Sequence, residues 1–288
     1  MPRPQAPRIP IARWRGRAWE HVDDAVAAEE PLQLLLNGEP LSIVMRTPGH
    51  DIELALGLLS AEHVIGSLAD VNEIRISAES GEREDRVRAI DDIVESNQID
   101  IRVREGTGRR PERSFLASSA CGVCGATTVE SLAHDHAPLA AGPRVEAATL
   151  PPLAHQLRGG QRVFDATGGL HAAGLFTAEG ELVMLREDIG RHNAVDKVVG
   201  RSLLDGRLPL STSVLAVSGR AGYEVVQKAV AAGIPILVAV GAPSSLAVAT
   251  AVRFGLTLVG FLRDDRFNVY AAPERLAGLE MPVASRVP

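Results

Sequence analysis

Cysteine is scarce in this chain, since Cys121 and Cys124 are the only two among its 288 residues. Lysine is equally scarce: Lys197 and Lys228 are the only two, and the other 28 basic residues are arginine. With a net charge of −6 and a pI of about 5.8, the chain has no general basic field. These numbers give no support to binding of nucleic acid.

A secretory signal and a long apolar run are also lacking. The first 19 residues are rich in proline and arginine and have no apolar core, unlike an export signal. The most apolar stretch, residues 234–252, is broken by Pro235, Gly241 and Pro243, which indicates a buried strand, a turn and a helix. We therefore expect a cytoplasmic protein that has no membrane span and keeps its thiols reduced.

The chain divides by pattern into three parts. Residues 1–28 are expected to be a flexible tail, residues 29–110 a small α+β subdomain, and residues 111–288 a larger α/β domain. Apolar runs at 32–36 and 41–46 flank Asn37-Gly38 and predict a β-hairpin. Thr47 and Pro48 then predict the start of a helix, with Thr47 as its N-cap. Residues 105–112 are predicted to be a linker, residues 137–152 are expected to be irregular, and residues 163–166 are predicted to form a strand.

Strands and helices alternate in the last third. Strands are predicted at 214–217, 236–240 and 256–262, with helices at 223–232 and 246–254 between them. This order implies parallel crossovers. Three loops would leave the carboxyl ends of these strands, where open α/β sheets bind ligands. They are Ser218-Gly219-Arg220, residues 241–245 and residues 263–266.

The cysteine pair reads Ala-Cys-Gly-Val-Cys-Gly over residues 120–125. A capping box at 127–130 predicts a helix just after it, whose N-terminus would stabilise a thiolate. The pair could carry sulfur, form a redox couple or be half of a zinc site. Zinc would need His134, His136 or His171 as further ligands, because no second cysteine pair exists.

Two other segments carry dense polar chemistry. Residues 187–197 combine two acids, an Arg-His-Asn cluster and an Asp-Lys pair at a strand-to-helix turn, which indicates a ligand cleft or a capped helix with a solvated first turn. Residues 167–171 form a glycine-rich turn that ends in His171. We expect arginines at strand ends to bind phosphate.

In order along the chain, these motifs resemble those of the formate dehydrogenase accessory sulfurtransferase family, FdhD. The matching segments run from about residue 30 to 270 and include TPGHD, SFLASSACGVCG, TGGLHAAG, EDIGRHNAVDKVVG, SGRAGYEVVQKAVAAGIPIL and GFLRDDRFNVY. The resemblance implies a cytidine-deaminase-like three-layer α/β core, preceded by the smaller α+β subdomain. Zinc chemistry is not implied, because the deaminase glutamate and proline are missing.

The resemblance also implies a function. A cysteine desulfurase would load sulfur onto Cys121 as a persulfide, with Cys124 assisting or resolving. The protein would bind the molybdenum bis(molybdopterin guanine dinucleotide) cofactor as a substrate, sulfurate it and deliver it to formate dehydrogenase. A homodimer and the absence of a resident metal are further expectations from the family.

The site residues follow from matching the motifs. The segment expected to bind the cofactor is Phe261-Leu262-Arg263-Asp264-Asp265-Arg266. Phosphate is expected to bind at Arg220, Arg263 and Arg266. Ser218 and Gly219 belong to the same expected anion-binding loop as Arg220. Residues expected in the cleft are His171, Arg191, His192, Asn193 and Asp196. Two other hypotheses stay open at this point: a cofactor chaperone whose cysteines only contact a partner, and a zinc hydrolase.

Overall fold

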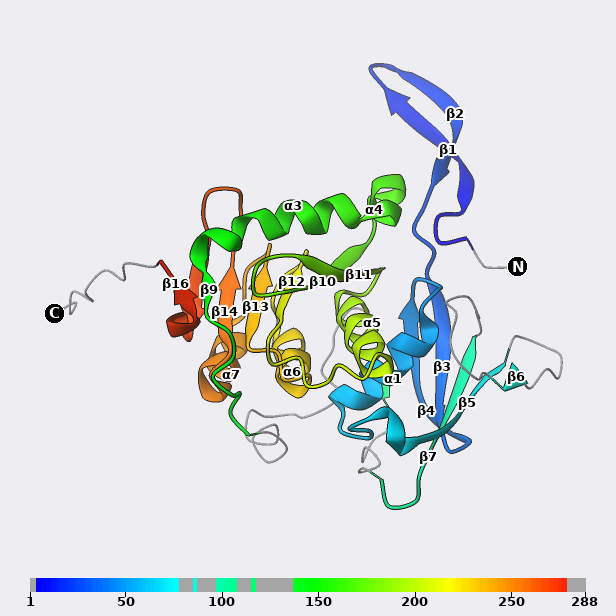
Figure 1. The fold of residues 1–288 in the computed structure, drawn as a ribbon. Coiled ribbons are helices and arrows are strands. Elements are labelled where there is room, and N and C mark those ends of the chain that lie inside the picture. The colour runs from blue at the N-terminus through cyan, green and yellow to red at the C-terminus, as the bar shows by residue number, and fades with distance from the viewer. Residues whose placement is uncertain (1–3, 78–84, 87–96, 108–114, 118–136, 279–288) are drawn as a thin grey trace.

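The computed structural model describes residues 4–77, 85–86, 97–107, 115–117 and 137–278. Both cysteines, the predicted capping box at 127–130 and most of the predicted linker at 105–112 lie outside these ranges. Within them the chain forms two six-stranded sheets, helices that pack on them, and an N-terminal hairpin (Figure 1). Among the described residues, no helix combines the length and the apolar character needed to cross a bilayer.

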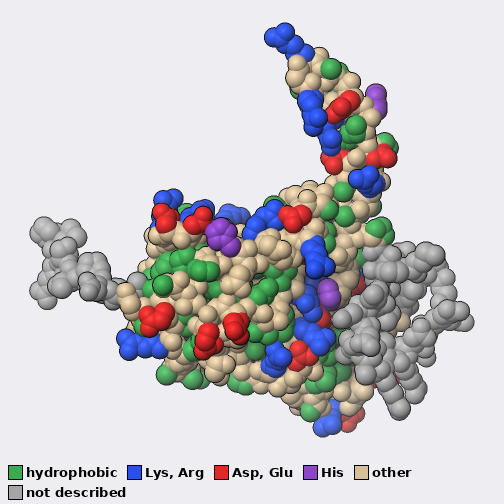
Figure 2. Space-filling view, turned by 45° about the horizontal axis from the view of Figure 1, so that its top comes forward, with side chains coloured by type: hydrophobic (Ala, Val, Ile, Leu, Met, Phe, Trp, Pro, Cys, Tyr) green, Lys and Arg blue, Asp and Glu red, His purple; other side chains and the backbone are tan. Residues whose placement is uncertain are grey.

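The N-terminal residues form a hairpin where we expected a flexible tail. Strands β1 (Arg8–Arg15) and β2 (Ala18–Ala25) pair antiparallel over eight residues and stand off from the body (Figures 1 and 2). Trp14 and Trp19 face each other across the strands with ring centroids 5.4 Å apart. The two strands contain Ile9, Ile11, Trp14, Trp19 and Val22, and such β-branched and aromatic side chains favour paired strands.

The first sheet is mixed and contains six strands in the spatial order β6 (Asp85–Arg86), β5 (Val71–Ser77), β7 (Gln98–Val103), β3 (Glu30–Leu36), β4 (Glu39–Arg46) and β8 (Phe115–Ala117). The predicted hairpin at 32–46 is confirmed as β3 and β4, with Asn37 and Gly38 both at positive φ in the turn. Strand β8 pairs parallel with β4. The sheet of the smaller subdomain therefore extends past residue 110, where we had placed its boundary.

The second sheet holds six strands in the spatial order β11 (Leu182–Asp188), β10 (His171–Phe176), β12 (Val214–Val217), β13 (Ile236–Ala239), β14 (Thr257–Gly260) and β15 (Asn268–Ala271). Strands β12, β13 and β14 are parallel, as predicted, and helices α6 (Tyr223–Ala231) and α7 (Ser245–Phe254) form their crossovers. A short parallel pair, β9 (Val145–Glu146) and β16 (Leu276–Ala277), lies beside this sheet (Figure 1).

Helices cover both faces of the second sheet, so this part has three layers (Figure 1). Helix α3 (Pro151–Gly160) covers one face, and Leu153 and Leu157 pack there on strand residues such as Val238. Helices α5 (Arg191–Leu204), α6 and α7 cover the other face. Strands β12, β13 and β14 are buried on both faces, which explains why their sequences are mostly apolar and do not alternate.

The two sheets are joined through a close helix crossing. Helix α1 (Asp51–Ala61), which packs on the first sheet, crosses α5 at two glycines. A Cβ atom on Gly57 would lie 1.9 Å from the carbonyl oxygen of Asp196, and one on Gly200 would lie 1.8 Å from that of Glu53. Only glycine allows this approach, so the crossing fixes one sheet against the other.

Three sequence-based predictions of local structure are wrong. Helix α1 begins at Asp51, and its N-cap is His50 in a left-handed conformation, because the Thr47 hydroxyl accepts a hydrogen bond from the backbone N–H of Ile189. The segment 163–166, predicted as a strand, lies in α4 (Arg162–Thr167). Residues 151–152, predicted as irregular, begin α3, where proline occupies the first helical position.

Candidate functional site

A cavity of about 590 Å³ opens at the carboxyl edge of the parallel strands. Ser218, Val240 and Leu262 follow β12, β13 and β14 and form the side of the cavity at the sheet edge. Helices α3 and α4 form the opposite side. The remaining lining residues are Ala154, His155, Leu157, Arg158, Gln161, Phe164, Gly168, Gly169, Leu170, His171, Arg263 and Asp264. Its volume suits a nucleotide-sized ligand.

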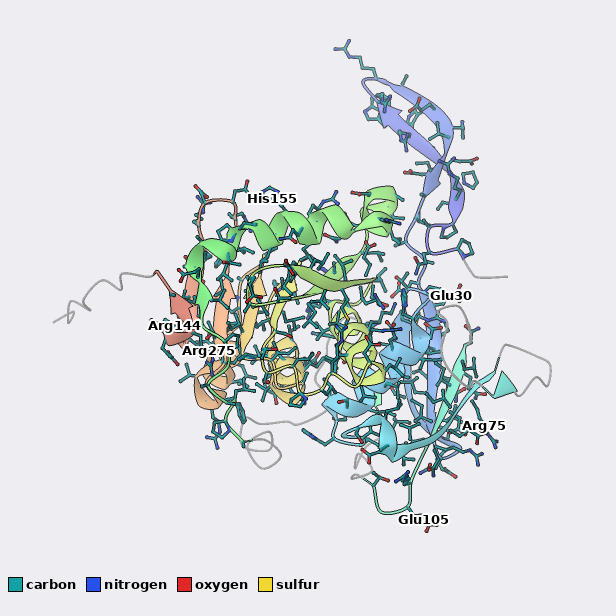
Figure 3. The ribbon with its side chains drawn as sticks, viewed as in Figure 1. Glu30, Arg75, Glu105, Arg144, His155 and Arg275 are labelled. Carbon is teal, nitrogen blue, oxygen red and sulfur yellow. The ribbon has the colours of Figure 1, made fainter. Side chains whose placement is uncertain are left out.

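The mouth of the cavity is charged and solvent-exposed. His155, on α3, lies 2.9 Å from Asp264 through its Nε2 atom, and both side chains are mostly exposed (Figure 3). The guanidinium of Arg263 donates hydrogen bonds to the carbonyl oxygens of Val240 and Leu262. Arg263 thus closes the turn after β14 and brings positive charge to the entrance.

The predicted cofactor-binding segment 261–266 is only partly at this cavity. Leu262, Arg263 and Asp264 line it. Phe261 and Arg266 instead line a neighbouring hollow of about 240 Å³, which Arg263 shares. Arg263 therefore joins the two, while Asp265 lines neither. Phe261 is 42% exposed and has a positive φ of 54°, so its ring stands out from the turn.

The predicted anion loop contacts a histidine at the sheet edge. The Ser218 hydroxyl accepts a hydrogen bond from the backbone N–H of Ala172, and a Cβ atom on Gly219 would lie 3.2 Å from Nδ1 of His171. Burial lowers the pKa of His171, and the positive charges of Arg191 and Arg220 lower it further, together with His192. His171 is therefore neutral at neutral pH in a positive potential that suits a phosphate.

Arg191 lies beside this group. Its Cβ atom is 3.8 Å from the position that a Cβ on Gly219 would take. Its Nε atom is buried and has no hydrogen-bond partner among the described residues. A buried donor without a partner is costly, and an anionic ligand would satisfy it.

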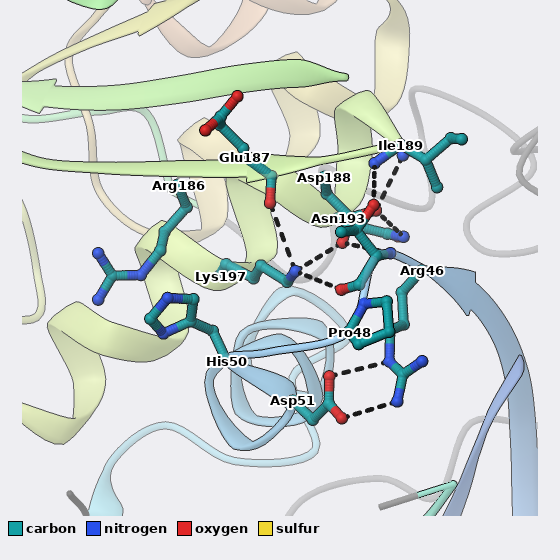
Figure 4. A network of polar contacts seen from close by, with 12 residues as sticks. Arg46, Pro48, His50, Asp51, Arg186, Glu187, Asp188, Ile189, Asn193 and Lys197 are labelled. Atoms are coloured by element: carbon teal, nitrogen blue, oxygen red, sulfur yellow. Dashed lines mark hydrogen bonds and ion pairs between the residues drawn. The ribbon is translucent and has the colours of Figure 1, made fainter. Parts of the chain in front are cut away.

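The polar motif at 187–197 serves mainly to join the two sheets (Figure 4). Asp188 and Lys197 are fully buried and form an ion pair of 2.7 Å. Lys197 Nζ also donates to the carbonyl oxygen of Thr47, and the Thr47 N–H donates to Asp188. The Asn193 amide donates to Asp188 and to the carbonyl oxygen of Met45. These contacts hold the end of β4 against the start of α5.

A second polar group also belongs to this junction. Arg46 pairs with Asp51 through two hydrogen bonds of 2.9 and 2.8 Å, both side chains being fully buried. Arg186 on β11 contacts Glu53 on α1 through two hydrogen bonds of 2.6 and 2.8 Å. Burial tends to raise the pKa of Glu53, but Arg186 and His50 outweigh this and lower it.

His192 and Asp196, both expected in the cleft, are engaged elsewhere. His192 Nδ1 lies 2.8 Å from Glu224, and Asp196 lies 2.6 Å from Nζ of Lys228. Burial opposes the charge of Lys228, but Asp196 and neighbouring carboxylates outweigh it, so the pKa of Lys228 is raised. Neither His192 nor Asp196 lines the cavity, and the same is true of Asn193 and Arg191.

Cys121 and Cys124 lie outside the described residues, so no distance joins them to the cavity. The strand before them is described: β8 ends at Ala117, and its partner in β4 is Val44. Because β8 and β4 are parallel, the chain leaves β8 at the sheet edge where the Thr47 junction lies. Among the described residues, no group of three His, Cys, Asp or Glu side chains could hold a metal ion.

The residues that α3 and α4 contribute to the cavity were not predicted from the sequence. Gln161, Phe164 and Leu157 line the cavity, but no motif distinguishes them, and parts of this segment were expected to be irregular or a strand. Proline at 151 and 152 was the available signal, since proline is favoured in the first turn of a helix.

Comparison with known proteins places the chain in a family. The model of the FdhD/NarQ family matches residues 27–277. Two proteins named "Sulfur carrier protein FdhD", from Mycolicibacterium paratuberculosis and Sulfolobus acidocaldarius, are 48% and 44% identical; each match covers 88% of this chain and 92% of the relative.

A solved structure supports the same relationship. It is a Desulfotalea psychrophila protein named as a formate dehydrogenase accessory protein. It has a TM-score of 0.73 and 27% sequence identity, and the match covers 95% of this chain and all of that one. The match of fold, length and sequence shows that this chain belongs to the FdhD/NarQ family.

Proposed function

We propose that this protein is a sulfurtransferase that carries sulfane sulfur as a persulfide on Cys121. The observation that carries the proposal is the family match, which spans Cys121 and Cys124 and includes relatives named as sulfur carriers. A thiolate attacks the outer sulfur of a donor persulfide, takes that sulfur and leaves the donor as a thiolate. The donor persulfide belongs to a cysteine desulfurase.

The acceptor we propose is the molybdenum bis(molybdopterin guanine dinucleotide) cofactor, bound as a substrate. The cavity supports this proposal through its nucleotide-compatible volume and its position at the carboxyl edge of parallel strands. Arg263 and Arg220 supply positive charge for its pyrophosphates, and the Nε of Arg191, which has no partner in the described part of the chain, supplies a donor. The sulfurated cofactor would then pass to formate dehydrogenase.

The proposed location, oligomeric state and metal content follow from the same family resemblance. The protein would act in the cytoplasm as a homodimer, without a resident metal of its own. Cys124 would resolve or assist the persulfide.

Mass spectrometry tests the sulfur-carrying step. After incubation with a cysteine desulfurase and cysteine, the wild-type protein should gain one or more sulfur atoms on Cys121. Cys121→Ala should lose that addition, while Cys124→Ala should still accept sulfur. An unmodified wild-type protein under these conditions would contradict the persulfide.

A cofactor chaperone without sulfur chemistry is the alternative, because a nucleotide-sized cavity at the sheet edge can bind a cofactor without any transfer of sulfur. Cys121→Ala would then still support maturation of formate dehydrogenase. If the protein is a sulfurtransferase, the same variant should bind the cofactor and yield inactive dehydrogenase. A zinc hydrolase would instead show about one zinc per chain by elemental analysis.

A further inference from the structure

We infer that the buried end of the cavity is a subsite for a planar base and that Gln161 binds the polar edge of that base. The inference rests on the proposed function, because it takes a guanine nucleotide as the ligand. It adds a residue and an orientation that the family motifs do not supply, since Gln161 lies between the matched segments.

The terminal amide of Gln161 is poised for a ligand. The residue is only 3% exposed, and it lines the cavity. Its Nε2 atom is buried without a hydrogen-bond partner among the described residues. Its backbone groups are satisfied, since its N–H donates to Arg158 and its carbonyl accepts from Asp165. The group of Gln161 that lacks a hydrogen-bond partner is therefore its side-chain amide, which borders the cavity.

The surroundings of Gln161 suit a flat ring. Leu157, Leu170 and Leu262 are almost fully buried and form an apolar wall. On the α3–α4 side, the Arg158 guanidinium lies 4.8 Å from the ring centroid of Phe164, so two planar groups border the same space. Apolar walls with a single convergent amide match a heteroaromatic base, which needs stacking surface and a few hydrogen bonds at its edge.

The charges of the site fix the orientation of the ligand. The positive groups at the sheet edge gather around His171 and the Ser218–Arg220 turn and at Arg263. Arg158, on the α3–α4 side, is paired with Asp165 at 2.5 Å, so its charge is already balanced. No charged side chain that lines the cavity is as deeply buried as Gln161. The phosphates therefore belong at the sheet edge, and the base belongs between α3 and the apolar wall. An amide donates to and accepts from the adjacent O6 and N1–H of guanine.

Isothermal titration with GDP and with pyrophosphate tests this subsite. The proteins are the wild type, Gln161→Met and Gln156→Met. Methionine keeps the length of glutamine and removes the amide. Gln156 is the matched control, because it lies on α3, does not line the cavity and donates to the carbonyl oxygen of Gly180. Thermal unfolding of each variant verifies that it is folded.

We expect Gln161→Met to bind GDP about tenfold more weakly and pyrophosphate as well as the wild type does, while Gln156→Met matches the wild type. The subsite is wrong if Gln161→Met binds GDP as Gln156→Met does, or if GDP and pyrophosphate weaken together, as a distorted cavity would cause. Failure of the wild type to bind GDP would instead overturn the guanine-nucleotide part of the proposed function.

Discussion

At the scale of single residues, buried ion pairs lie at the junction between the two sheets. Asp188 and Lys197 meet with no exposed surface on either side chain, and backbone groups of Thr47 satisfy part of their remaining hydrogen-bonding capacity. Such a pair adds little net stability compared with an apolar pair, but it is costly to break, since the remaining charge has no water. The junction therefore depends on both partners.

Replacing Lys197 with methionine should lower the free energy of unfolding by about 3–5 kcal/mol, because Asp188 stays buried without its countercharge. Urea denaturation of the purified protein measures this. Asp205→Ala, which breaks a partly exposed pair with Arg201 on the same helix, should cost less than about 0.5 kcal/mol. A similar small loss for Lys197→Met would contradict a role for this pair in the junction.

His171 makes stability depend on pH. Burial and nearby positive groups lower its pKa below the usual 6.5, so the unfolded chain binds more protons as pH falls through 6.5. The folded protein therefore loses stability below about pH 6.5, until pH reaches the folded pKa. Between pH 7 and pH 5, His171→Gln should show a smaller fall in melting temperature than the wild type. Equal falls in the two proteins would exclude this contribution.

At the scale of elements, the crossing of α1 and α5 is the contact that holds the two sheets together. Gly57 and Gly200 let the helix backbones approach until a methyl group would overlap a carbonyl oxygen. Helix propensity would favour alanine at both positions by roughly 1 kcal/mol. Glycine therefore lowers the intrinsic stability of each helix, and the close packing of the two helices offsets that loss. The packing of the helices outweighs their intrinsic preference here.

Gly200→Ala should destabilise the protein although it raises the helix propensity of α5, because backbone atoms of α1 would have to move. We expect a loss of about 2 kcal/mol or more in the free energy of unfolding. Gly159→Ala in α3 is the control: nothing lies within 4 Å of its added methyl group, and it should be neutral or stabilising by up to about 1 kcal/mol. The two variants should thus change stability in opposite directions by urea denaturation.

At the scale of the whole molecule, the body and the N-terminal hairpin differ in how they are held. The central strands of the second sheet are buried on both faces, whereas Trp14 and Trp19 are more than half exposed at the hairpin (Figure 2). An isolated two-stranded hairpin is only marginally stable in water. The hairpin should therefore open far more often than the body.

Hydrogen exchange followed by mass spectrometry should show this difference. Peptides from residues 8–25 should exchange fastest among the described strands, and those from 214–217 and 236–239 slowest. Strong protection of residues 8–25 would contradict an isolated hairpin and would indicate that it packs on another molecule, such as a second copy of the chain. Dilution would then restore fast exchange.

Part of the fold was predictable because the structure of some segments depends only on their local residue pattern. Asn37-Gly38 between apolar runs dictates a two-residue hairpin, and buried apolar runs that alternate with helices dictate a parallel sheet. The parallel order also placed Ser218 and Arg263 at one edge, as the structure confirms. Long-range partners could not be predicted: Thr47 has the chemistry of an N-cap, but Ile189, which lies 142 residues away, uses its hydroxyl.

The sequence by itself determined the family, the pairing of the central strands and the edge at which a ligand would bind, because motifs and periodicity are local properties of the chain. Only the tertiary structure decided which polar residues face that ligand. Asn193 and Asp196 come from the richest motif yet form buried contacts at the helix junctions, whereas Gln161 comes from no motif and borders the cavity. The physical reason is that a side chain's partner depends on packing between distant segments, which no local pattern records.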